Sequence, residues 1–117
     1  MTPMKLTKTR TTNFMQVQEF LDTIMEWWTE DHGGTPPDLP DAHRNPGFGW
    51  KTKEQLASSK PFGKLMIAPG VKGVDSNLYK ALTAGVPPYP RMPNEGPFMP
   101  DWWTEYIAQW IDEGMPG

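Results

Sequence analysis

Two stretches rich in proline and glycine, residues 33–50 and 86–99, divide this chain into short pieces. Proline lacks a backbone N–H and clashes with the preceding turn, so neither stretch can continue a helix or lie in the centre of a sheet. Connections of this length without regular structure are uncommon in a compact domain, and are either functional or laid over its surface. Regular structure must therefore form before, between and after them.

The segment before the first stretch has the pattern of an amphipathic helix. Asn13 is a suitable N-cap, and Gly33 and Gly34 are suited to end the helix. Between them, large apolar residues recur at steps of three and four, which predicts one buried face. These residues are Phe14, Val17, Phe20, Leu21, Ile24, Trp27 and Trp28.

Three further helices are predicted. Thr52 to Gln55 reads as a capping box that opens a short helix to about Ser59, and Asp75 or Ser76 caps another that ends at Gly85. Pro100 suits the first turn of a last helix. Its buried stripe is predicted to hold Trp103, Tyr106, Ile107, Trp110 and Ile111. Residues 62–70 are expected to be an extended segment packed on the core, so the fold class is all-α.

Composition limits the size and setting of the core. The 117 residues fit one domain, and 37% are hydrophobic, but the six Trp, five Phe and three Tyr bury large areas each. We expect a flexible arm over residues 1–12 and a single helical domain over residues 13–117.

Several classes of function are made improbable by composition. A net charge of −3 gives no basic field for nucleic acid. The absence of cysteine excludes disulfides, zinc–cysteine sites and thiol catalysis. No apolar run suits a membrane span or signal peptide. We therefore expect a cytoplasmic protein, with a cleaved precursor as the alternative.

Four motifs occur in a fixed order. They are WTEDHGG at residues 28–34, PGVKGVDSNLYKAL at residues 69–82, PRMPNEGP at residues 90–97 and IAQWIDEGMP at residues 107–116. This order resembles bacterial cytochrome c-like domains over about residues 14–117, and the second half of the chain carries the specific part. The resemblance implies a small helical fold around a pocket, with long Pro/Gly-rich loops.

The resemblance also implies a haem with His32 and Met92 as axial ligands, and electron transfer. The chain departs from that pattern because Trp28 and Asp31 stand where the haem-attaching cysteines would be. Covalent haem is therefore excluded. Met92 is then equally well explained as core packing and His32 as a helix-end side chain. The tryptophans are a plausible filling for the space that a haem would leave.

We interpret the chain as a non-catalytic accessory domain without haem that docks on a partner protein. The partner would be an oxidoreductase or a second copy of the chain. Adjacent residues of a helix point about 100° apart, so one tryptophan of each Trp-Trp pair is expected to leave the core face. The residues assigned to docking are Trp28, Trp102, Tyr89 and Arg91.

Two alternatives remain open. The first is a cofactor-binding electron-transfer protein, with non-covalent haem on His32 and Met92, or with copper on His32, His43 and methionines. The second is a small enzyme that uses the emptied haem pocket. No catalytic residue is assigned, because no nucleophile elbow or phosphate-binding glycine spacing is visible.

Overall fold

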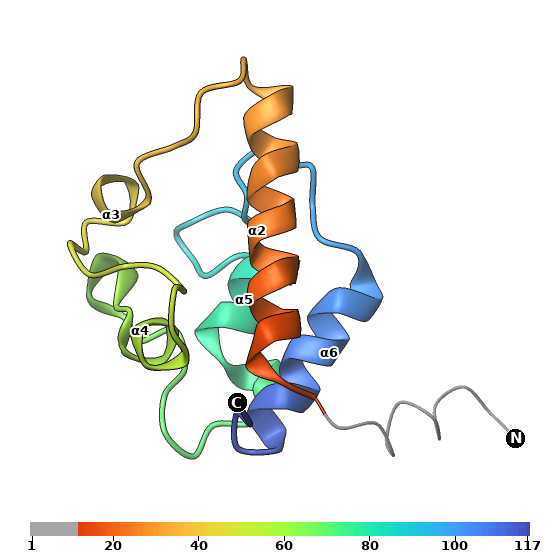
Figure 1. The fold of residues 1–117 in the computed structure, drawn as a ribbon. Coiled ribbons are helices and arrows are strands. Elements are labelled where there is room, and N and C mark those ends of the chain that lie inside the picture. The colour runs from red at the N-terminus through yellow and green to blue at the C-terminus, as the bar shows by residue number, and fades with distance from the viewer. Residues whose placement is uncertain (1–11) are drawn as a thin grey trace, which may run out of the picture.

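The computed structural model describes residues 12–117. The longest helix among these residues is α2 (Phe14–Asp31), and the other elements are arranged around it (Figure 1). The elements that follow are α3 (Leu39–Ala42), α4 (Lys53–Ser58), η1 (Pro61–Gly63), η2 (Gly73–Asp75), α5 (Asn77–Thr83) and α6 (Asp101–Asp112). No strand occurs within the described residues. The prediction of an all-α fold is thus confirmed.

Helix α2 begins and ends where its sequence predicts. The Asn13 side chain accepts a hydrogen bond from the backbone N–H of Gln16 at 2.8 Å, which satisfies one free donor of the first turn. At the other end Gly34, with a φ of +87°, donates its N–H to the Thr29 carbonyl. The buried face of α2 includes Phe20 and Ile24, but the prediction was wrong for Trp27, which is exposed, and Trp28 is only half-buried.

Helix α6 packs beside α2 and supplies much of the core (Figure 1). Ile107 and Trp110 are fully buried, and the Trp103 ring stacks on Phe20 with centroids 4.6 Å apart. The structure differs from the prediction at the start of this helix. Pro100 is the residue before the first turn, and Asp101 opens the turn.

Helix α5 and the turn η2 complete this half of the core. Of the two proposed caps, Ser76 is the one used: its hydroxyl accepts from the N–H of Tyr79 at 3.1 Å. Gly73 in η2 lies directly against α6, because a Cβ added there would be 2.6 Å from the Ala108 Cα. Its N–H donates to the Asp112 carboxylate at 2.7 Å.

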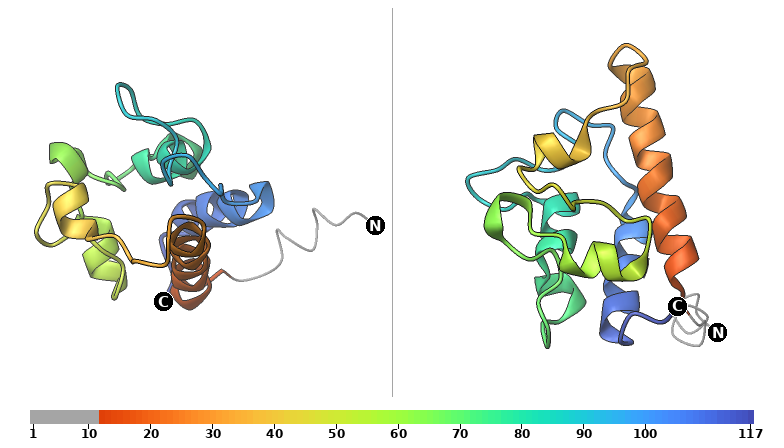
Figure 2. Two further views of the ribbon diagram at one scale, coloured as in Figure 1. Left: turned by 90° about the horizontal axis from the view of Figure 1, so that it is seen from above. Right: turned by 60° about the vertical axis from the view of Figure 1, so that its left-hand side comes forward.

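The two short helices α3 and α4 lie on the side of α2 away from α6 (Figures 1 and 2). The predicted helix after Thr52 is α4, and the Thr52 hydroxyl accepts from the Gln55 N–H at 3.0 Å. Helix α3 was not predicted. It occupies four residues of the first proline-rich stretch, too few to show a helical period, and it begins with Asp38 as its cap and a proline in its first turn.

The segment after α4 packs on the core. It opens with the 3-10 turn η1, and then Met66 and Ile67 are buried. The Met66 carbonyl accepts from the N–H of Leu78 at 2.9 Å, which ties this extended segment to the start of α5.

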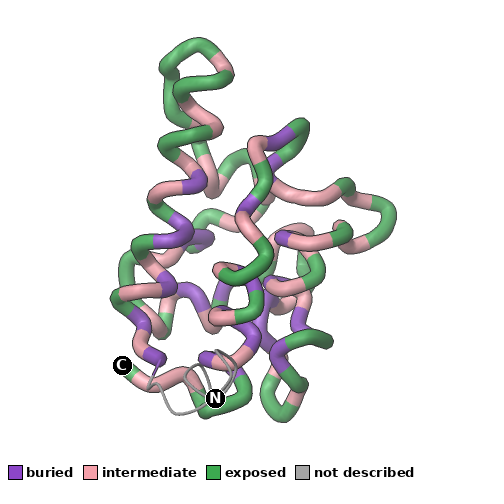
Figure 3. Tube along the Cα trace, turned by 90° about the vertical axis from the view of Figure 1, so that its right-hand side faces the viewer, coloured by how far each residue is buried: buried purple, intermediate pink, exposed green. Residues whose placement is uncertain are grey.

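The predicted arm over residues 1–12 lies outside the described residues except for Thr12. Thr12 is 1% exposed, and its hydroxyl donates to the Glu113 carboxylate at 2.6 Å. Thr12, which was predicted to belong to the arm, thus contacts the residue that follows α6. By contrast, the far end of α2 and the turn after it are mostly exposed (Figure 3).

No helix in residues 12–117 is both long enough and apolar enough to cross a membrane.

Candidate functional site: an apolar cavity beside α2

A cavity of about 390 Å³ lies between α2, α5 and the two proline-rich stretches. Helix α2 contributes Ile24 and Trp28 to its wall, α5 contributes Ala81, and the second stretch contributes Met92. The volume falls in the range of small-molecule pockets, about 300–1,000 Å³, which are mostly apolar with a few polar groups. The residues that line this cavity are likewise mostly apolar, with a few polar groups among them.

A continuous run of aromatic rings forms one wall of this cavity. The Tyr89 ring stacks on Phe62 with centroids 4.3 Å apart, and Phe62 is followed by His43 at 6.5 Å. His43 in turn stacks on Phe48 at 3.9 Å, and Phe48 meets Trp50 edge-on at 6.0 Å. We call these five side chains the aromatic wall. They come from three segments of the chain, so the wall exists only in the folded state.

Trp28 closes the cavity at the end of α2. Its indole N–H donates to the Asn94 carbonyl at 3.1 Å, so it connects the long helix to the second proline-rich stretch. A second connection lies close by, because the Met92 N–H donates to the Ala81 carbonyl at 2.7 Å. Trp28 thus lines the cavity and also connects two segments that are far apart in the chain.

His43 is the half-buried imidazole of the aromatic wall. Its Nδ1 lies 2.8 Å from the Leu39 carbonyl oxygen, which can only accept a hydrogen bond. Burial lowers the pKa of His43 below the usual histidine value, although the hydrogen bond to Leu39 acts in the opposite direction. The ring is therefore neutral near pH 7, with the proton on Nδ1 and a free lone pair on Nε2.

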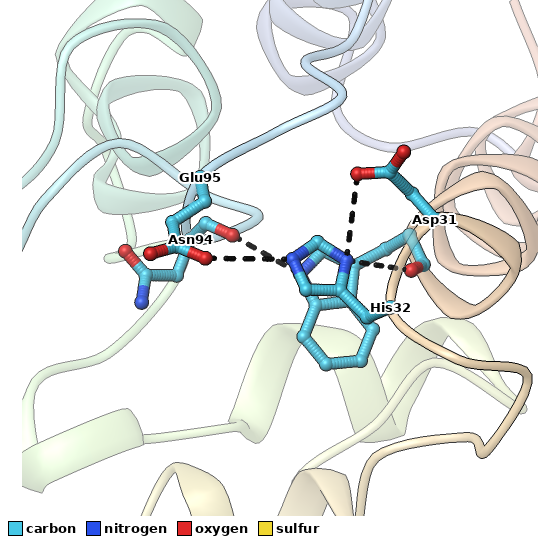
Figure 4. Close-up of polar contacts among 5 residues, drawn as sticks. Asp31, His32, Asn94 and Glu95 are labelled. Atoms are coloured by element: carbon cyan, nitrogen blue, oxygen red, sulfur yellow. Dashed lines mark hydrogen bonds and ion pairs between the residues drawn. The ribbon is translucent and has the colours of Figure 1, made fainter.

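His32 lies outside the cavity. Its ring stacks on the Trp28 indole with centroids 4.1 Å apart, and its Nδ1 is 2.8 Å from the Trp28 carbonyl. The Nε2 atom is 3.6 Å from Glu95, and Nδ1 is 3.8 Å from Asp31 (Figure 4). This histidine joins the end of α2 to the second proline-rich stretch.

The structure separates the two residues that were predicted as haem ligands. Met92 lines the cavity and His32 does not. This donor pair does not fit a haem placed in the cavity unless the His32 ring leaves Trp28. Among the residues that the structure describes, the cavity is lined by one imidazole, that of His43, and by the thioethers of Met25, Met66 and Met92. Haem binding remains a prediction.

Copper was the other predicted metal. His43 lines the cavity and His32 does not, so the structure does not bring them together around the cavity. Within residues 12–117 no three side chains among His, Cys, Asp and Glu gather closely enough to hold a metal ion. Copper also remains a prediction.

The four residues predicted for docking do not share one surface. Trp28 and Tyr89 line the cavity. Arg91 lies over the Phe98 ring at 4.3 Å and donates to the Leu82 carbonyl. Trp102 differs from them, since 62% of it is exposed.

An exposed aromatic surface surrounds Trp102. Trp103 lies between Trp27 and Trp102, with centroid distances of 5.3 and 6.1 Å, and Phe20 packs beneath Trp102 and Trp103. Trp27 is 37% exposed. We call Trp27, Trp102 and Trp103 the tryptophan patch. One tryptophan of each adjacent pair is exposed, as expected from helix geometry, but in the first pair it is Trp27 and not Trp28, the residue assigned to docking.

Sequence reasoning missed the aromatic wall. His43 was predicted only as a copper ligand, and Tyr89 only as a docking residue. One local signal was available, because Leu39 and His43 are four residues apart after an Asp-Leu-Pro helix start. That spacing brings a carbonyl within reach of a histidine ring.

Comparisons of the chain with known protein families, curated proteins and solved structures found no match. The function must therefore be argued from the cavity and the surface of this molecule.

Proposed function

We propose that this chain binds a flat, mostly apolar small molecule in the cavity beside α2. The observation that carries the proposal is the cavity of about 390 Å³ bounded by the aromatic wall. Binding sites for small molecules are concave and mostly apolar, and they are lined by aromatic side chains with a few polar groups. The space beside α2 has these properties.

The wall favours a planar ligand. Two of its ring pairs are nearly parallel, with 8° between His43 and Phe48 and 17° between Phe62 and Tyr89. Aromatic rings offer large rigid faces and favour offset stacking or edge contacts with other rings. Each Å² of apolar ligand surface removed from water contributes about 25 cal/mol. A fused-ring compound would bind both through stacking on the rings and through the burial of its apolar surface.

The test is a binding titration with a simple fused-ring probe, 2-methoxynaphthalene. Trp28 and Trp50 line the cavity, so saturable binding should change the intrinsic fluorescence and raise the melting temperature. Ala81→Leu places a larger side chain in the cavity and should weaken binding at least tenfold. Ala84→Leu, just after α5 and outside the cavity, is the matched control and should bind normally.

Absence of saturable binding to the wild-type chain would overturn the proposal, and so would unchanged binding by Ala81→Leu. A parallel titration with haemin tests the cofactor suggested by the sequence. A Soret band that saturates, and that weakens in Ala81→Leu, would identify haem as the planar ligand.

We also propose a fold family and a cellular compartment for this chain. We infer a cytochrome c-like shell that has lost covalent haem attachment, supported by the motifs over residues 69–116 and by Trp28 in the place of a cysteine. The absence of cysteine fits the cytoplasm, where thiols are kept reduced.

The tryptophan patch supports a second candidate function, docking on another protein. Exposed tryptophan is rare on monomers and enriched at the energetic centres of interfaces. Exposed Asp101 and Glu105 flank Trp102, so a partner surface with apolar residues and a basic rim would complement it. The partner would be an oxidoreductase or a second copy of the chain.

Sedimentation equilibrium tests the second copy directly. If the patch pairs with itself, the wild-type chain is a dimer and Trp102→Ser is a monomer with an unchanged far-ultraviolet circular dichroism spectrum. A monomeric wild-type chain would overturn self-association through this patch.

A further inference from the structure

Resting on the proposed function, we infer that His43 anchors the ligand through Nε2 and that the ligand is a hydroxyaromatic compound. The imidazole would accept a hydrogen bond from a hydroxyl group carried on the flat ring system.

The protonation state follows from the Leu39 contact. A carbonyl oxygen has no proton to give, so the 2.8 Å contact requires the proton on Nδ1. In the neutral ring Nε2 is then an acceptor, and it has no hydrogen-bond partner in the part of the chain that the structure describes. An acceptor of this kind binds O–H or N–H groups and repels a carboxylate.

The ring is held in place from two directions. It stacks on Phe48 at 3.9 Å with 8° between the planes, and the Leu39 contact fixes its rotation about that stack. A binding group held by packing and by a second hydrogen bond loses little freedom when a ligand arrives. The fixed imidazole therefore favours ligands that place a hydrogen-bond donor against it within an otherwise apolar cavity.

Several other polar groups line the cavity, and some of them are already hydrogen-bonded. The indole N–H of Trp28 donates to the Asn94 carbonyl, and that of Trp50 donates to the Asp22 carboxylate at 2.8 Å. The Asn77 amide donates to the Leu65 carbonyl at 2.8 Å, and the Tyr89 hydroxyl and the exposed Lys64 are the remaining titratable groups of the cavity. Tyr89 is therefore the residue to separate from His43 by mutation.

The test compares two ligands that differ by one proton donor, 2-naphthol and 2-methoxynaphthalene, by calorimetry on the full chain. One net hydrogen bond contributes about 0.5–1.5 kcal/mol, so 2-naphthol should bind the wild-type chain about 2- to 12-fold more tightly. His43→Phe keeps a ring against Phe48 and should bind both ligands equally. Tyr89→Phe is the matched control and should keep the preference.

A second measurement does not depend on any variant folding. In the wild-type chain with ¹⁵N-labelled histidine, the Nε2 resonance of His43 should shift with 2-naphthol and remain close to its free position with 2-methoxynaphthalene. Equal affinities for the two ligands, a preference retained by His43→Phe, or identical Nε2 resonances would overturn the role of His43. Failure of both ligands to bind would instead overturn the proposed function itself, and this inference with it.

Discussion

At the residue scale, the neutral His43 side chain makes stability depend on pH. Its pKa in the folded chain is lowered by burial, whereas in the unfolded chain it is close to the ordinary 6.5. Between these two values the unfolded chain binds more protons, so the free energy of unfolding rises with pH through this window. The contribution is complete above the unfolded pKa and is lost as the pH falls through the folded pKa.

We therefore expect urea denaturation of the wild-type chain to give a lower free energy of unfolding at pH 5 than at pH 7.5. In His43→Phe this difference should shrink, because no imidazole has to be protonated in the cavity. The other titratable groups that line the cavity, Lys64 and Tyr89, are present in both proteins. The change in the pH difference can therefore be assigned to His43. An unchanged pH difference in His43→Phe would contradict the expectation.

At the element scale, the crossing of η2 over α6 allows no side chain at Gly73. A Cβ there would lie 2.6 Å from the Cα and carbonyl carbon of Ala108, and helix backbone cannot move aside cheaply. Gly73→Ala should lower the free energy of unfolding by about 1–3 kcal/mol, as overpacking does. Urea denaturation measures this loss.

The matched control for that crossing is Gly47→Ala. A Cβ at Gly47 would meet no atom within 4 Å, and its backbone does not need a positive φ. Its effect should stay within about 0.5 kcal/mol. If the two variants unfold at the same urea concentration, the close crossing is not what stabilises this pair of elements.

At the scale of the whole molecule, Trp28 couples the end of α2 to the second proline-rich stretch across the cavity. Trp28→Phe keeps an aromatic ring but loses the hydrogen bond to the Asn94 carbonyl. We expect a loss of about 1 kcal/mol in stability and faster amide hydrogen exchange around residues 92–96. Ligand added to the wild-type chain should slow exchange in the same segment.

Helix starts could be predicted because their causes are local. Asn13, Thr52 and Ser76 each accept a hydrogen bond from an N–H three residues ahead, so a few residues of sequence contain the whole interaction. Helix α3 could not be found in this way, since a single turn shows no periodicity. The exposure of Trp102 was predicted from its position beside Trp103, but the same reasoning chose Trp28 in the other pair, where Trp27 is the exposed residue.

The sequence by itself determined the all-α class, the main helices and the exclusion of covalent haem, because caps, periodicity and a missing cysteine are properties of neighbouring residues. Only the tertiary structure decided that His43 lines the cavity and that His32 stays outside it. It also decided that Phe48, Phe62 and Tyr89 form one wall. These residues lie far apart in the chain, and a binding site depends on which side chains meet when distant segments pack together.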